Sequence, residues 1–153
     1  MERNIVVIGV GNILYGDDGV GVHAVNQLRQ ESFPPNVKIM DAGTAGIDLL
    51  YLIEDTDYAI IVDCLDAGDE PGAVYRIPWE ELAGQYPGDQ TVSLHDLNLW
   101  SVLSLADRLG KISTVVIFGV QPDNIGFGSD MSAIVSSKLP YLVQSIKKEI
   151  ANI

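Results

Sequence analysis

The chain has 153 residues, a length typical of one domain, and we expect a single domain over residues 1–153. Apolar residues make up 47% of the chain and charged residues 20%, a composition that excludes intrinsic disorder. Twenty-one acidic side chains against nine basic ones give a net charge of −12, which disfavours binding to nucleic acid or to an anionic membrane surface.

The expected location follows from the cysteine count and the apolar runs. The single cysteine, Cys64, has no partner for an internal disulfide, so nothing indicates an oxidising compartment. The apolar run Ile5–Val10 is too short for a signal peptide. The sequence has no stretch of about 20 apolar residues, so no transmembrane helix is expected. We therefore expect a cytoplasmic protein with no membrane partner.

Apolar runs alternate with helical patterns along the chain, which is typical of α/β folds. The expected strands are Ile5–Val10, Val37–Asp41, Tyr58–Cys64, Ala73–Ile77 and Thr114–Val120. The expected helices are Asp18–Gln30, Gly46–Glu54, Leu94–Leu109 and Ser132–Ile150. The strand Ala73–Ile77 follows its predecessor too closely for a helical crossover, so we expect it to be antiparallel.

The third expected helix carries both a start and a stop signal. Ser93 and Asp96 have the S-x-x-D spacing of a capping-box variant. Gly110 is a typical C-terminal stop. The pattern predicts a helix that begins near Leu94, with His95 in its first turn.

Polar residues fall where the expected parallel strands end. Asp18 begins the helix after the first strand, and Asp41 and Asp63 end the second and third strands. His95 begins the helix that feeds the last strand from its amino end. Ligands of open parallel sheets bind beyond the carboxyl ends of the strands, so we expect these four side chains to share one rim. Carboxylates and a neutral imidazole suit a divalent metal with open coordination positions.

Other roles are open for the same residues. Any one of the rim aspartates can equally cap a helix or a turn, and Asp17 is the stronger candidate for capping. Cys64 points to the opposite sheet face from Asp63 and is expected to be a core thiol rather than a nucleophile.

Known catalytic motifs are absent or incomplete. Gly9–Leu14 follows a dinucleotide-binding fingerprint up to its sixth position, where Leu14 replaces the glycine or alanine required for close packing. A Rossmann-like nucleotide-binding enzyme remains an alternative on this basis. The sequence has no phosphate-binding P-loop, no nucleophile elbow and no zinc motif.

Six motifs, taken together and in order, resemble the [NiFe]-hydrogenase maturation endopeptidases over nearly the whole chain. They are Gly9–Leu14, Gly16–Gly21, Asp41–Gly46, Val62–Asp63 with Pro71–Gly72, Ser93–His95 and Phe118–Pro122. The resemblance implies a three-layer α/β/α sandwich of the phosphorylase/hydrolase-like kind. Its five-stranded mixed sheet would have the order 2-1-3-5-4, with strand four antiparallel, in agreement with the separate expectation for Ala73–Ile77.

The resemblance also implies a function. Family members remove a short C-terminal extension from the hydrogenase large-subunit precursor after nickel has entered its cysteine-ligated site. The family's nickel-recognition ligands correspond to Asp18, Asp63 and His95, and we expect the nickel to be supplied by the substrate, with no tightly bound cofactor. Asp41 is assigned to loop organisation or substrate contact, as a possible additional catalytic residue.

Two alternatives concern the mechanism and the kind of function. Nickel can act as a template and Lewis acid, or one of the aspartates can act as general base. A non-catalytic module that binds a nickel-loaded precursor through the same rim is a further alternative to a protease.

Overall fold

The computed structural model describes residues 2–44, 48–83, 93–94, 97–110 and 114–153. The strands are β1 (Ile5–Val10), β2 (Val37–Gly43), β3 (Tyr58–Asp66), β4 (Val74–Pro78), β5 (Ser93–Leu94) and β6 (Thr114–Val120). The helices are the 3₁₀ segment η1 (Ile13–Gly19), α1 (Val20–Leu28), α2 (Asp48–Glu54), α3 (Trp79–Ala83), α4 (Leu97–Arg108) and α5 (Ala133–Ala151).

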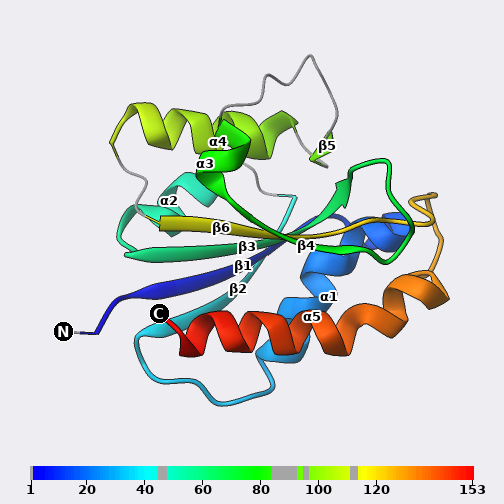
Figure 1. Ribbon diagram of the computed structural model, residues 1–153, viewed down its shortest axis with the longest axis horizontal. Coiled ribbons are helices and arrows are strands. Elements are labelled where there is room, and N and C mark those ends of the chain that lie inside the picture. Colours follow the sequence, from blue (N-terminus) through cyan, green and yellow to red (C-terminus); the bar gives the residue numbers. More distant parts are fainter. Residues whose placement is uncertain (1, 45–47, 84–92, 95–96, 111–113) are drawn as a thin grey trace.

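A mixed sheet lies between two helical layers (Figure 1). Its strand order is β2-β1-β3-β6-β4; β1, β2, β3 and β6 are parallel, and β4 is antiparallel to β6. This confirms the expected order 2-1-3-5-4, the expected fifth strand being β6. The two-residue β5 lies off this path and pairs with the end of β3.

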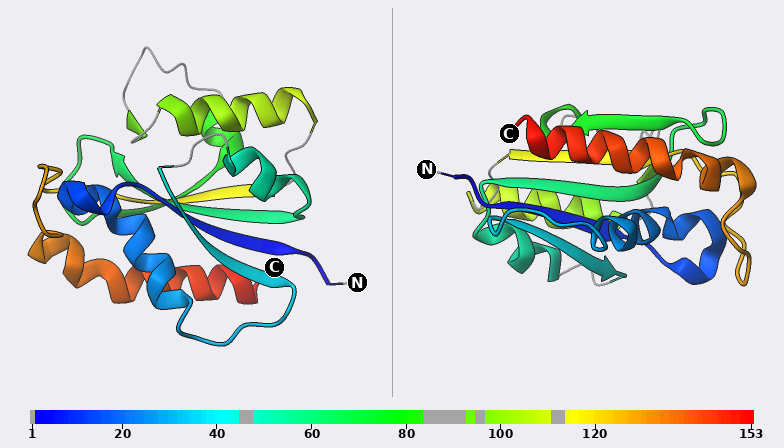
Figure 2. Two further views of the ribbon diagram at one scale, coloured as in Figure 1. Left: turned by 180° about the vertical axis from the view of Figure 1, so that it is seen from behind. Right: turned by 90° about the horizontal axis from the view of Figure 1, so that it is seen from below.

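Each face of the sheet has its own apolar core because neighbouring strand residues point to opposite faces. Val7 on β1 packs in the core beneath α1 and α5, whereas Val6 and Ile8 pack in the core beneath α2, α3 and α4. Figure 2 shows the two helical layers on opposite sides of the sheet. Both helical layers thus hold the strand ends in fixed positions.

One expectation about local structure is wrong, and one helix was not predicted. The helix expected from Leu94 begins at Leu97, because Ser93 and Leu94 form an antiparallel pair with Asp66 and Leu65 of β3 instead. The short helix α3 was not expected at all. No helix within the described ranges is long and apolar enough to cross a membrane.

Candidate active site

Asp18 lies in η1, directly beyond the carboxyl end of β1. Its side chain is buried, and its Oδ2 accepts a hydrogen bond of 2.9 Å from the backbone N–H of Asn12. Gly11 makes this approach possible: its φ is +128°, and a Cβ there would lie 2.1 Å from the carbonyl oxygen of Asp18. The glycine-rich turn after β1 therefore allows Asp18 to pack against the carboxyl end of β1.

Asp63 lies near the carboxyl end of β3, in register with Gly119 of β6. It is fully buried, and its Oδ1 accepts a hydrogen bond of 2.7 Å from the N–H of Cys64. The start of α1 packs closely against the end of β3. A Cβ on Gly21 would lie only 2.1 Å from the carbonyl oxygen of Val62. Close packing at Gly21, three residues after Asp18, brings η1 and the end of β3 together.

The pKa of the Cys64 thiol is affected by the negative charges at this edge of the sheet. Burial raises the pKa of its thiol well above the usual range, and the negative charges of Asp63, Asp18 and Asp17 raise it further. The thiol packs in the core beneath α1 and α5, as expected for a core cysteine. Three aspartates that converge from two elements thus share one electrostatic neighbourhood.

Of the other two predicted site residues, only Asp41 lies within the described part of the chain. Asp41 lies on β2, in register with Gly9 of β1. Asp41 is exposed, and its carboxylate accepts a hydrogen bond of 2.9 Å from the N–H of Gly43. That contact lies within the last three residues of β2. His95 lies outside the described residues. Its predecessor Leu94 pairs with Leu65, two residues beyond Asp63, so the backbone leading to His95 lies beside the end of β3.

Asp17 has a larger role than the helix cap expected from the sequence. The carboxylate is fully buried and accepts four hydrogen bonds, from the N–H groups of Asp123, Asn124 and Ser132 and from the Ser132 hydroxyl, at 2.6 to 2.9 Å. Ser132 is the N-cap of α5. Asp17 therefore fastens the loop before α5 to η1, across more than 100 residues of sequence.

Gln121 organises the loop that follows β3. Its Oε1 accepts a hydrogen bond of 2.8 Å from the N–H of Ala67, and its Nε2 donates one of 3.0 Å to Asp66. The bond from Gln121 lowers the pKa of the Asp66 carboxyl. Gln121 belongs to the motif Phe118–Pro122. The sequence around it does not predict its role in the loop after β3, because its hydrogen-bond partners lie more than 50 residues away.

The chemistry available to this edge is that of carboxylates. Two buried aspartates from separate elements can orient a water molecule, accept a proton or bind a divalent ion. Among the described residues, no group of three or more His, Cys, Asp or Glu side chains is arranged to hold a metal ion. Because His95 is outside those residues, the set of Asp18, Asp63 and His95 remains a prediction.

Comparison with known proteins places this architecture in a family. The family model described as hydrogenase maturation protease matches residues 22–149. The hydrogenase expression/formation protein HupD of Bradyrhizobium diazoefficiens is 38% identical over 79% of this chain and 64% of its own length. HoxM of Azotobacter vinelandii is 34% identical over 89% of this chain and 67% of its own length. The chain thus spans about two thirds of these relatives.

Solved structures agree. The hydrogenase maturating endopeptidase HybD from E. coli is 29% identical and superposes with a TM-score of 0.86, covering 97% of this chain and 93% of that one. The [NiFe] hydrogenase maturation protease HycI from Thermococcus kodakarensis is 25% identical, with a TM-score of 0.76 over 95% of this chain and 91% of that one. The chain therefore belongs to the hydrogenase maturation protease family, a family of peptidases, as its motifs predicted.

Proposed function

We propose that this chain is an endopeptidase that removes the C-terminal extension of a [NiFe]-hydrogenase large-subunit precursor after nickel insertion. The observation that carries the proposal is the pair of buried carboxylates, Asp18 and Asp63, at the carboxyl edge of a chain of this family. We place this activity in the cytoplasm.

The nickel belongs to the substrate in this proposal. Asp18, Asp63 and His95 would complete the coordination of nickel that the precursor already holds through cysteines. Such a set has two carboxylates and no thiolate, so it should bind free divalent ions weakly. It would contact nickel only when a nickel-loaded precursor is docked. The protein's own contribution is a fixed, negatively charged edge.

Two roles are open to Asp18 and Asp63. Each can bind nickel, which then acts as template and Lewis acid, or one can take a proton from the attacking water. Asp41 accepts a hydrogen bond from the N–H of Gly43 at the end of β2, and we propose loop organisation or substrate contact as its role.

The decisive test uses nickel-loaded and nickel-free precursor in parallel. The protein is stripped with a chelator, the chelator is removed, and the loss of the C-terminal extension is read by mass spectrometry. Cleavage of the loaded precursor alone is the expected result. Equal cleavage of both forms, or a need for metal restored to the protease, would contradict the proposal and indicate an ordinary metallopeptidase.

His95→Ala is the matched variant. We expect it to lose processing while circular dichroism and thermal stability stay near those of the wild type. Tight binding of loaded precursor by the wild type without any cleavage would favour the non-catalytic binding module instead.

A further inference from the structure

Five large apolar side chains are exposed together beside the candidate active site. Two segments supply them, η1 and the loop before α5. They form what we name the apolar platform: Ile13, Leu14, Tyr15, Ile125 and Phe127, with exposed fractions of 41 to 74%. Exposed apolar side chains gathered in one place are typical of interaction surfaces.

The platform is one continuous surface although its two segments lie more than 100 residues apart. The rings of Tyr15 and Phe127 have centroids 5.3 Å apart, and the N–H of Gly128 donates a 2.7 Å hydrogen bond to the carbonyl of Leu14. Figures 1 and 2 show the loop before α5 beside η1 from each direction. The platform is therefore built by tertiary contacts.

These contacts also hold the platform in one shape. Asp17 binds the N–H groups of Asp123 and Asn124 in the loop, and its own N–H donates to the carbonyl of Asn124. Gly16, with φ +60°, lets the two segments meet, because a Cβ there would lie 2.5 Å from the Asn124 oxygen. A surface ordered before binding loses little conformational entropy when a partner docks.

The platform is continuous with the candidate active site. Its first residues, Ile13–Tyr15, lie between Asn12, whose N–H binds Asp18, and Asp18 itself. A polypeptide that covers Ile13–Tyr15 would therefore lie over the segment that also carries Asp18.

The distribution of charge around the platform indicates what kind of segment would bind to it. The segments 11–16 and 124–129 contain no charged residue, while exposed Asp123 and Asp130 flank the loop on a chain of net charge −12. We infer that the apolar platform docks an apolar segment of the precursor that is flanked by lysine or arginine residues. This inference rests on the proposed function, because it takes the precursor as partner.

The first test measures binding rather than cleavage. Phe127→Ser removes the most exposed platform side chain, and Tyr51→Ser on α2, a side chain 69% exposed, is the matched control. Binding of immobilised nickel-loaded precursor is followed by biolayer interferometry. We expect Phe127→Ser to raise the dissociation constant roughly tenfold or more, and Tyr51→Ser to leave it unchanged. Thermal unfolding of both variants checks the fold.

The second test addresses charge. Replacement of Asp123 and Asp130 by asparagine should lower the association rate and reduce its dependence on salt. Wild-type association that is independent of ionic strength would overturn the basic flanks of the proposed segment.

The outcomes separate this inference from the proposed function. A wild type that binds precursor without cleaving it contradicts the protease, while the platform is still judged by Phe127→Ser. Equal affinity of Phe127→Ser and wild type, or no detectable wild-type binding, overturns the platform as precursor dock. Sedimentation of the protein alone checks self-association: a dimer that Phe127→Ser dissociates would make the platform an interface between copies and overturn the inference.

Discussion

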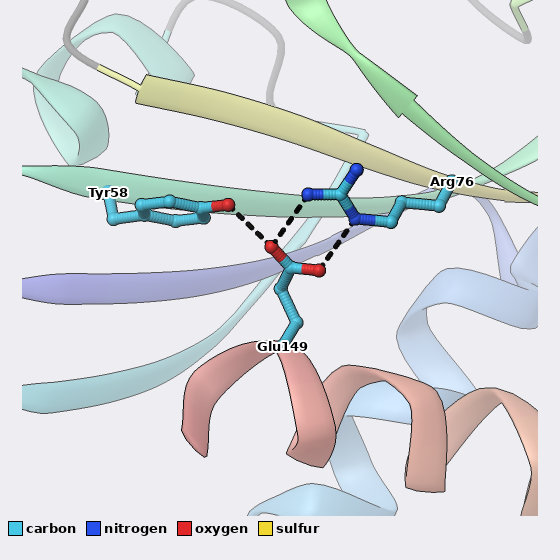
Figure 3. Close-up of polar contacts among 3 residues, drawn as sticks. All are labelled: Tyr58, Arg76 and Glu149. Atoms are coloured by element: carbon cyan, nitrogen blue, oxygen red, sulfur yellow. Dashed lines mark hydrogen bonds and ion pairs between the residues drawn. The ribbon is translucent and has the colours of Figure 1, made fainter. Parts of the chain in front are cut away.

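Acidic side chains at the two ends of the sheet are held in different ways. At the amino end, Glu149 of α5 accepts hydrogen bonds of 2.7 and 3.0 Å from the guanidinium of Arg76 on β4 and one of 2.5 Å from the hydroxyl of Tyr58 on β3 (Figure 3). At the carboxyl end, backbone N–H groups donate to Asp17, Asp18 and Asp63.

The difference separates a structural acid from candidate catalytic ones. A guanidinium neutralises Glu149, so its charge joins α5 to the sheet. A backbone N–H donor orients a carboxylate without supplying a full positive charge. The negative charge of the carboxyl-end aspartates is felt at Cys64, whose thiol pKa it raises. In the function that we propose, the carboxyl end is the one that meets a cationic ligand.

The strongest test of this comparison is Asp63→Asn, with Asp18→Asn beside it. Each change keeps the side-chain shape and removes one charge, so we expect precursor processing to fall about 100-fold or more with the fold retained. The control is Glu149→Gln, which should process precursor at the wild-type rate. Wild-type processing by Asp63→Asn would remove that residue from the mechanism.

At the amino end the expected effect is on stability. Glu149→Gln loses the charge-assisted bonds to Arg76, and we expect the free energy of unfolding to fall by about 1 kcal/mol, because the Arg76 side chain is 48% exposed and solvent screens the pair. Urea unfolding of variant and wild type measures it. An unchanged midpoint would show that the cluster contributes nothing measurable.

The same cluster predicts a pH dependence. The bond from Arg76 lowers the pKa of Glu149 in the folded protein from its ordinary value of 4.5. The stability that this shift contributes is therefore present above pH 4.5 and is lost as the pH falls through the lowered folded value. The stability difference between wild type and Glu149→Gln should shrink in acid; a difference that is constant with pH would contradict the assignment.

The smallest expected effect concerns Cys64. Because burial and nearby negative charge raise the pKa of its thiol, we expect no labelling by iodoacetamide at about pH 8 in the folded protein. Labelling after denaturation is the positive control. Stoichiometric labelling of the folded chain with matching loss of processing would make Cys64 a nucleophile.

The sheet was predictable because its signals are local or topological. The continuous apolar runs of β1, β3 and β6 indicate strands covered on both faces, and the short connection before β4 fixes its antiparallel direction. Asp18 and Asp63 could be placed at one edge because parallel strands share their carboxyl ends.

Long-range contacts decided the features that the sequence did not predict. Ser93 and Asp96 match a capping pattern, yet Ser93 pairs with Asp66, since β3 extends beyond its expected end at Cys64. Asp17 was assigned to capping because its donors, from Asp123 to Ser132, are remote in sequence. The helix α3 has only five residues, which is too short for a periodic apolar pattern to predict it.

The central claim is that the carboxyl-end rim contacts the substrate's nickel. X-ray absorption at the nickel edge tests it, on loaded precursor alone and on precursor mixed with this protein and frozen before cleavage is complete. We predict additional oxygen and nitrogen neighbours at about 2 Å from nickel in the mixture, and fewer of them with Asp63→Asn. A nickel spectrum that is identical with and without the protein would contradict the claim.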